Sequence, residues 1–373
     1  MLIRTPDYYD KFKCIAGECK DTCCAGWQVD VDDASYEYYK TITGDFGDRL
    51  HSVMVDGVKG AEGQFRIRED GRCPFLNDNN LCDLYTALGE DALCVTCDQY
   101  PRYTTEYGNL RETGIALSCQ TAAELILTED RTPGFTEHND EDAFPALNDI
   151  DGLLFLNLRD ARKRAFDMVW NRETDIYGRM RILLDYAINL QRNIKNPDRL
   201  RNIITDYNPP ASWRPRKADK ASAYRTFWKY YLRQVIIKRE WVELAGLCDS
   251  ILYGSGYDNI ESEYRSYCRT YAYEYENILS YFVFRYFLKG VFDRDVLTKV
   301  KMAIVSTLMI MQCDMAVRIS EARRLLERGV SSAEAAVETG FSDQSHFTNY
   351  FTAFTGLTPG ACRELFRQEW ERG

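Results

Sequence analysis

The chain has 373 residues, of which 45% are hydrophobic, and a formal net charge of -10 at pH 7. This length and composition predict a folded protein of two or three domains with buried cores. The acidic balance excludes a general electrostatic footprint for nucleic acid. The opening sequence MLIRTPDYYD lacks the charged start, apolar core and cleavage site of an export signal.

Two apolar runs, NILSYFVFRYFL from Asn277 and AIVSTLMIMQC from Ala303, fall short of the about 20 residues that a bilayer-spanning helix requires. We expect them to form buried helices. The sequence therefore predicts a cytoplasmic protein with no membrane partner.

Cysteine is concentrated in the first third, where nine of the thirteen cysteines precede residue 120. They lie in CIAGECKDTCC from Cys14, GRCPFLNDNNLCDLY from Gly71, LCVTCDQYPR from Leu93 and LSCQTA from Leu117. Reducing compartments rarely keep structural disulfides, so clustered thiols there indicate metal binding or redox chemistry. The remaining four are expected to be ordinary core or surface residues of helices: Cys248, Cys268, Cys313 and Cys362.

A metal cluster needs about four converging thiolates, which short spacings and distant segments supply together. The three histidines, His51, His138 and His346, provide few nitrogen ligands, so an all-sulfur site is favoured. Zinc held by four thiolates and a four-iron cluster both fit, and the Cys73–Pro74 dipeptide favours iron–sulfur. Nine thiols in 119 residues argue against the alternative of unliganded buried cysteines.

The spacing differs from the CxxxCxxC motif of standard radical S-adenosylmethionine enzymes, from a ferredoxin run and from a zinc finger. The CVTC segment from Cys94 resembles a thioredoxin-type pair, but no strand-helix pattern surrounds it. We therefore set the thioredoxin interpretation aside.

Beyond the Cys-rich region, the polar stretch TEDRTPGFTEHNDEDAFPALND from Thr128 is typical of a linker. The segments LLFLNLRDARKRAFDMVW and YGRMRILLDYAINLQRNI carry apolar residues at helical spacing. A longer aromatic stripe with the same period runs from Tyr264 to Tyr286. We expect it to pack in a core rather than to form an aromatic groove for a substrate amine.

The predicted protein is thus mainly α. It comprises a Cys-rich region of short irregular elements at 1–127, a linker at 128–150, a helical body at 151–314 and a helix-turn-helix-like bundle at 315–373.

The segments FKCIAGECKDTCCAGWQVDVD, RCPFLNDNNLCDLY, TCDQYPR and SCQTAAELIL resemble the amino-terminal signature of the flagellin lysine-N-methylase family. They are also similar to a broader group of Cys-rich domains that chelate zinc or iron. The resemblance spans about residues 1 to 310. Cys94 matches no position of the signature. The resemblance places the metal site at Cys14, Cys19, Cys23, Cys24, Cys73, Cys82, Cys97 and Cys119.

The resemblance implies methyl transfer from S-adenosylmethionine to lysine side chains of flagellin. The lysine amine must be neutral to attack, so its pKa has to fall below the usual value of about 10.4, and a Tyr or carboxylate accepts the proton. No GxGxxG follows a strand, and YGSGYD from Tyr253 is an isolated turn, so a Rossmann-type methyltransferase is unsupported. The sequence assigns neither a catalytic residue nor a residue that binds S-adenosylmethionine.

The carboxyl-terminal ISEARRLLERGVSSAEAAVETGFSDQSHFTNYFTAFTGLTPGACRELFRQ resembles the second helix-turn-helix half of AraC-type transcription regulators, over about residues 316–367. Gly329 and Gly340 are expected to end two helices, and Ser331 or Ser332 to cap the second. Ser342 or Asp343 is expected to cap the helix at QSHFTNYFTAFTG, which corresponds to the recognition helix.

Several features argue against DNA binding by this bundle. Asn349 and Thr352 stand where basic residues would hold phosphates. Residues 316–373 contain seven arginines, no lysine and eight acidic residues, and only one half of the two-part reader is present. We therefore expect a protein-docking or structural appendage.

The favoured hypothesis is a protein-lysine methyltransferase that carries a Cys-ligated iron–sulfur cluster, or zinc, as structural or electronic support. One alternative is a metal- or redox-sensing regulator that binds DNA through the bundle. Another is a metal-binding scaffold without catalysis. Oligomeric state and the target lysines are not specified by the sequence.

Overall fold

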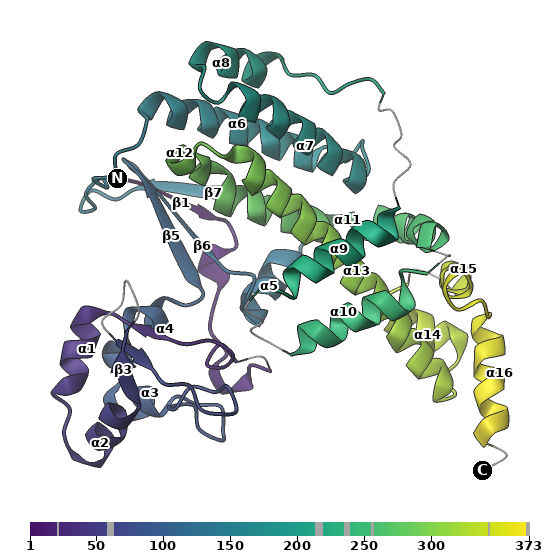
Figure 1. Cartoon of the computed structure of the whole chain (residues 1–373), viewed down its shortest axis with the longest axis horizontal. Coiled ribbons are helices and arrows are strands. Elements are labelled where there is room, and N and C mark those ends of the chain that lie inside the picture. The colour runs from purple at the N-terminus through teal and green to yellow at the C-terminus, as the bar shows by residue number, and fades with distance from the viewer. Residues whose placement is uncertain are drawn as a thin grey trace. The chain divides into compact units, whose positions relative to one another are not determined.

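The computed structural model describes residues 1–20, 22–57, 63–212, 219–234, 239–254, 257–341 and 344–370. The chain forms two compact units, Met1–Ile150 and Asp151–Gly373 (Figure 1). Among the described residues, sixteen α-helices accompany seven short strands. The predicted mainly α class is confirmed.

The first unit is built from short helices and two small sheets. Its elements are β1 (Leu2–Pro6), β2 (Asp30–Val31), α1 (Asp33–Lys40), α2 (Gly44–Val53), β3 (Met54–Asp56), β4 (Gly63–Phe65), α3 (Asp83–Leu88), α4 (Val95–Gln99), β5 (Arg102–Tyr107), β6 (Leu110–Ile115), α5 (Gln120–Leu127) and β7 (Phe135–Asn139). Single turns of 3-10 helix lie at Tyr9–Lys11, Ala16–Glu18 and Glu90–Ala92.

The larger sheet has the strand order β5-β6-β1-β7. Strand β1 runs parallel to β6, with Leu2 opposite Leu110, and antiparallel to β7, with Pro6 opposite Phe135. Strands β5 and β6 form an antiparallel hairpin whose turn uses Gly108 at a φ of 59°. The smaller sheet has the order β2-β4-β3 and is antiparallel throughout.

The stretch expected to be a linker, 128–150, belongs to the first unit. Its strand β7 pairs with β1 over five residues. The Met1 ammonium donates to the Asp140 carbonyl at 2.7 Å, and the Ala146 N–H donates to the Gly108 carbonyl at 3.0 Å. These backbone bonds hold the polar stretch to the sheet although it has little apolar surface to bury.

A hydrophobic core lies beside the smaller sheet and positions much of the Cys-rich region. Tyr39, Phe65 and Phe75 are almost fully buried in it. Phe65 and Phe75 meet edge to face at 5.0 Å, and the Tyr39 hydroxyl donates to the Ala92 carbonyl at 2.7 Å. Cys73, Cys82 and Cys97 pack against the same core while remaining partly exposed.

The second unit is helical throughout its described residues. Its elements are α6 (Gly152–Trp170), α7 (Ile176–Asn193), α8 (Pro197–Asp206), α9 (Lys220–Tyr231), α10 (Glu240–Ile251), α11 (Tyr257–Tyr286), α12 (Gly290–Asp293), α13 (Val296–Glu327), α14 (Ser332–Glu338), α15 (Gln344–Thr355) and α16 (Pro359–Trp370). A 3-10 turn at Phe287–Lys289 separates α11 from α12.

Helix α13 is the central element of this unit and packs against α7, α10, α11 and α16 (Figure 1). Because the apolar run from Ala303 continues in a helix of 32 residues, α13 is long and apolar enough to cross a membrane, contrary to expectation. Its apolar side chains nevertheless have protein partners, since Val300, Met311 and Met315 are fully buried within the unit. Packing of this kind is typical of a core helix.

The aromatic stripe of α11 packs inward as expected, with Tyr264 and Tyr275 buried. Both hydroxyls donate to one carboxylate oxygen of Asp314, at 2.6 and 2.8 Å. The stripe is not one straight helix, because Tyr271 has non-helical backbone angles that kink it. The spacing pattern alone did not reveal this kink.

The carboxyl-terminal helices form the predicted helix-turn-helix arrangement. Ser331 and Glu334 cap each other's backbone in a capping box at the start of α14, and Gly329 and Gly340 adopt positive φ angles of 83° and 77°. The expected caps Ser342 and Asp343 lie outside the described residues. Since α13 is continuous, the domain boundary expected at residue 314 falls inside a helix.

Candidate functional site

The consecutive residues Cys23 and Cys24 lie at the centre of the Cys-rich region. The Trp27 indole donates to the Cys23 carbonyl at 2.7 Å, and the Cys24 carbonyl accepts from the Cys73 N–H at 2.7 Å. The Cys23 thiol hydrogen-bonds to Cys24, which lowers the pKa of Cys24 to about 7 and raises the pKa of Cys23 far above its usual range. Of the two thiols, Cys24 is therefore the one that loses its proton more readily.

A first set of thiols surrounds Cys23. The hydrogen bond to Cys24 is the largest cause of the raised pKa of Cys23, and the neighbouring Cys14 and Cys119 raise it further. Burial raises the pKa of Cys119, the residue that precedes α5, and Cys19 and Cys14 raise it further. Locally, the Ala16 N–H donates to the Cys14 sulfur at 3.4 Å at the start of a 3-10 turn. The structure thus brings Cys14, Cys19, Cys23 and Cys119 together.

A second set surrounds Cys24. Burial, followed by the neighbouring Cys24 and Cys82, raises the pKa of Cys73 to about 12. Burial also raises the pKa of Cys82, again with Cys24 nearby. A hydrogen bond to Cys94 raises the pKa of Cys97 above its usual range, and Cys24 and Cys73 add to the shift. This set is Cys24, Cys73, Cys82 and Cys97.

Backbone pairing explains how distant segments meet at the second set. An isolated antiparallel bridge joins Ala25 to Arg72, with the Gly26 N–H donating to the Gly71 carbonyl at 2.8 Å. A second bridge joins Leu76 to Cys82. These bridges place Cys73 beside Cys24 and bring Cys82 back toward it.

The eight expected ligands therefore divide into two sets of four. Their all-sulfur chemistry suits zinc or an iron–sulfur cluster, and all cysteines with described side chains are free of disulfides. In the geometry of the described chain, however, no three Cys, His, Asp or Glu side chains converge closely enough to hold a metal ion.

The structure adds one thiol that the sequence left aside. Cys94 is fully buried, donates to the Asp30 carbonyl at 3.8 Å, and has a pKa lowered by its bond from Cys97. Cys94 precedes α4, and no strand leads into that helix. The CxxC spacing in the sequence could have predicted that Cys94 lies next to Cys97.

Two of the four cysteines of the second unit, which were expected to be isolated, lie close together. Cys248 of α10 is buried and hydrogen-bonds to Cys313 of α13, which raises the pKa of Cys313 above its usual range. Cys362 is buried in α16, and the side chain of Cys268 lies outside the described part.

Neither histidine with a described side chain belongs to the two sets: His51 Nε2 lies 2.9 Å from the Tyr39 carbonyl, and His138 lies in β7. The side chain of His346 is not among those described.

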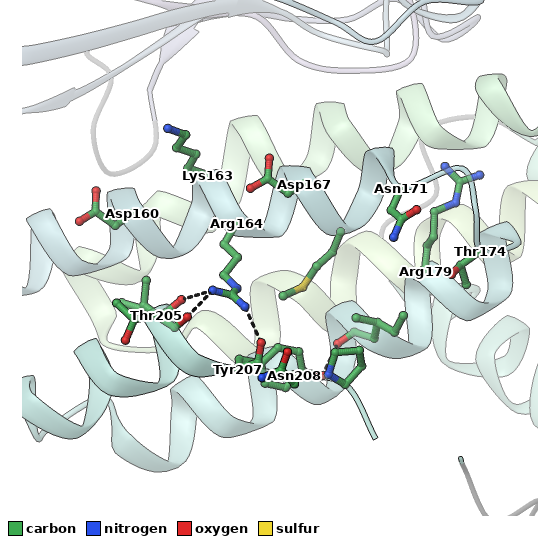
Figure 2. Close-up of a pocket in the computed structure, with 14 residues that line it drawn as sticks. Asp160, Lys163, Arg164, Asp167, Asn171, Thr174, Arg179, Thr205, Tyr207 and Asn208 are labelled. Carbon is green, nitrogen blue, oxygen red and sulfur yellow. Dashed lines mark hydrogen bonds between the residues drawn. The ribbon is translucent and has the colours of Figure 1, made fainter. Parts of the chain in front are cut away.

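The second unit contains a groove of about 630 Å³ between α6, α7 and α8 (Figure 2). Arg164 reaches from α6 to the end of α8, where it donates to the carbonyls of Ile204 at 2.8 Å and Thr205 at 2.7 Å. Arg179 lines the groove near Asn171 and is only 3% exposed. A smaller groove of about 370 Å³ also involves Tyr207 and Asn208. Nothing in the sequence pattern had indicated these grooves.

The carboxyl-terminal bundle is held to the helical body by α13 and by aromatic contacts. Arg318 bonds the Asp314 carboxylate at 2.8 and 2.9 Å and the Thr339 carbonyl at 2.8 Å. On α15, Tyr350 packs on Tyr264 at 6.3 Å. The sequence of α15 contains neither Lys nor Arg. The would-be recognition helix thus offers neither Lys nor Arg to neutralise a phosphate.

Comparison with known proteins identifies the helical part. Residues 162–330 match the FliB lysine N-methylase C-terminal domain, and residues 309–365 match a helix-turn-helix domain. The chain is 26% identical over 174 residues to a lysine-N-methylase of Salmonella typhimurium and, at the same identity and length, to one of Salmonella choleraesuis. It is 26% identical over 138 residues to the flagellar biosynthetic protein FliU of Salmonella muenchen, covering 35% of this chain and 79% of FliU.

The match covers 42% of this chain and 42% of each lysine-N-methylase, so the chain spans less than half the length of these relatives. No solved structure matches. The domain matches overlap on α13, the helix that the body and the bundle share. Residues 162–330 of this chain are therefore similar to the FliB lysine N-methylase C-terminal domain.

Proposed function

We propose that the chain is a protein-lysine N-methyltransferase that transfers the methyl group of S-adenosylmethionine to lysine ε-amines of flagellin. The observation that carries this proposal is the FliB lysine N-methylase C-terminal domain at residues 162–330. The names of the relatives, lysine-N-methylase and flagellar biosynthetic protein, support the reaction and the flagellar substrate.

The reaction is a displacement at carbon. The neutral ε-amine attacks the methyl carbon as the carbon–sulfur bond breaks, leaving S-adenosylhomocysteine and a methylammonium that loses a proton. Because a lysine amine in water is protonated at pH 7, the enzyme has to desolvate it and lower its pKa. A tyrosine or carboxylate is the natural proton acceptor.

We propose further that the eight thiols of the first unit hold metal, with an iron–sulfur cluster favoured over zinc. The supporting observations are their division into two four-thiol sets and the Cys73–Pro74 dipeptide. Each set would join segments that are distant in the chain, as structural metal sites do. When bound, an iron–sulfur cluster supplies cross-linking of these segments and one-electron chemistry.

The proposed location is the cytoplasm, where thiols stay reduced. Flagellin is the proposed protein partner.

The test is transfer of labelled methyl from S-adenosylmethionine to purified flagellin, with the enzyme prepared without air. The proposal predicts label on lysine. The matched control is flagellin whose lysines have been acetylated, which should take up none, because an amide nitrogen is not nucleophilic. Absence of label on native flagellin would refute the proposed reaction.

The helix-turn-helix match favours a second candidate, a regulator that binds DNA. Two observations argue against the regulator. Helix α15 contains neither Lys nor Arg. One face of α15 is also buried, because Phe347, Tyr350 and Phe351 are almost fully covered. A gel shift with duplex DNA whose affinity falls steeply with salt would support the regulator.

A further inference from the structure

The groove between α6, α7 and α8 has the dimensions of a binding site. Its volume of about 630 Å³ lies within the range of roughly 300–1,000 Å³ typical of ligand sites. Along α6 it extends from Asp160 to Asn171 (Figure 2). At about 1.5 Å per helical residue this is on the order of 16 Å, which accommodates about five residues of extended chain.

The hydrogen-bond donors of the groove's arginines are largely taken up by the protein. Arg164 donates to carbonyls at the carboxyl end of α8, the negative end of that helix dipole. Arg179 donates to the Val169 carbonyl at 2.7 Å and to Glu276 at 2.5 Å. Arg179 is therefore paired with a carboxylate, and the guanidinium of Arg164 points its donors at backbone carbonyls rather than at a ligand.

The carboxylates of the groove are not neutralised in this way. Asp160 is half-buried and Asp167 exposed, and neither side chain makes a hydrogen bond or ion pair with the described part of the chain. Lys163 is the one lining lysine. The adjoining groove adds Asp185 and Asp206. The charge left over along both grooves is negative.

The remaining lining combines apolar and hydrogen-bonding groups. Met168, Ile182 and Ile204 offer apolar surface for an aliphatic stem. At the other end lies Arg179, whose buried Nε has no hydrogen-bond partner among the described residues. A buried donor without a partner is costly, and a carbonyl of a bound chain is the kind of group that would satisfy it after a small shift.

We infer that this groove holds the acceptor segment of the substrate, a polypeptide whose lysine lays its aliphatic stem on Met168 and Ile182 and places its ammonium beside Asp167, while Asp160, two turns away on α6, adds to the negative charge of the groove. The inference rests on the proposed methyl transfer to lysine. The groove is a substrate-binding surface, and Asp160 and Asp167 are positioning residues. No covalent step occurs through them.

The test compares the full-length chain with the double variant Asp160→Asn/Asp167→Asn. Binding of fluorescently labelled flagellin is measured by anisotropy, and binding of S-adenosylmethionine by calorimetry. The inference predicts that the variant binds flagellin about tenfold more weakly, with a smaller salt dependence, because the ammonium loses its carboxylate partner and the groove loses two negative charges. Binding of S-adenosylmethionine should be unchanged.

The matched control is Asp198→Asn/Glu243→Gln, which removes two exposed carboxylates of the same unit that do not line the groove. It should bind flagellin as the wild type does. Asp160→Glu/Asp167→Glu, which keeps both charges, should restore most of the affinity. This rescue separates lost charge from lost folding.

Flagellin binding that is unchanged in Asp160→Asn/Asp167→Asn would overturn the inference. So would a loss confined to S-adenosylmethionine, which would make the groove the donor site. Either result is compatible with the proposed reaction as long as the wild type methylates flagellin. Conversely, a wild type that transfers no methyl group refutes the proposed function. In that case the binding measurement still shows whether the groove binds flagellin.

Discussion

Cys23 and Cys24 are adjacent in the chain, yet their thiols belong to different sets of cysteines. Cys23 interacts with Cys14 and Cys119, whereas Cys24 lies near Cys73 and Cys97. A single dipeptide therefore links two groups that each hold four of the expected ligands, with Cys94 as a further sulfur beside Cys97. Four cysteines are the number that a zinc ion or a four-iron cluster requires.

This arrangement predicts that the two sets lose metal independently. Cys23→Ser should lower the metal content of the chain by about half and destabilise the first unit, and Cys24→Ser should do the same through the other set. Cys362→Ser, a buried cysteine of the second unit, is the control and should keep full metal content. Elemental analysis of protein prepared without air measures the effect. Complete loss from either variant would mean a single shared centre.

Asp32 predicts a pH dependence of the first unit. Although burial raises its pKa, the N–H groups of Val95 and Ser35 donate to its carboxylate at 2.9 and 3.1 Å, and the pKa is lowered overall. Because the pKa of Asp32 is lower in the folded state than in the unfolded state, the ionised carboxylate stabilises the fold at pH values above the unfolded pKa of about 3.9. This stabilisation is lost as the pH falls through the folded-state pKa. Asp32 caps α1 and also bonds the first residue of α4.

Asp32→Ala should therefore lower the free energy of unfolding by about 1–2 kcal/mol at pH 7. The difference from the wild type should shrink as the pH falls below about 3.9. Urea denaturation followed at pH 7 and at acid pH measures both values. A difference that persists unchanged in acid would contradict the role of the ionised carboxylate.

Replacing Glu276 should strongly destabilise the second unit. It is fully buried and pairs with the buried Arg179 and with Arg172, whose Nε and a terminal nitrogen both donate to it at 3.0 Å. Glu276→Gln leaves a buried guanidinium without its counter-charge, so the free energy of unfolding should fall by about 3–5 kcal/mol. Glu364→Gln, which breaks an exposed pair with Arg367, should cost less than about 1 kcal/mol. Equal effects in denaturant titrations would contradict this explanation.

The sequence identified the helices whose apolar residues recur at helical spacing, such as α6 and α7, because their buried faces are continuous. It missed β7, since FTEHN is mostly exposed and joins the sheet through backbone pairing and contacts of Glu137 and Phe135 with Arg4, which leave no apolar periodicity in the sequence. It placed a boundary inside α13 because family resemblance changes there while the helix continues.

The site was likewise only partly predictable. Spacing supplied the eight thiols but not their division into two sets, which depends on the pairing of Ala25 with Arg72. The groove could not be foreseen, because its walls come from residues as distant as Asp160 and Tyr207, which look like ordinary charged and aromatic positions of separate segments.

The bundle predicts weak interaction with DNA. Because α15 lacks Lys and Arg, the wild-type chain should give no gel shift with duplex DNA at physiological salt. Asn349→Arg/Thr352→Arg adds two positive charges to α15 and should introduce weak, salt-sensitive binding. A tight complex with the wild type would contradict the assignment of the bundle as a structural or protein-docking appendage.

The central claim is that this chain methylates lysine. Mass spectrometry of flagellin peptides after incubation with S-adenosylmethionine and the purified chain tests it most directly. The account predicts lysine peptides heavier by one methylene for each methyl group added, and only when enzyme and donor are both present. Flagellin peptides of unchanged mass, from enzyme that retains its metal and its fold, would contradict it.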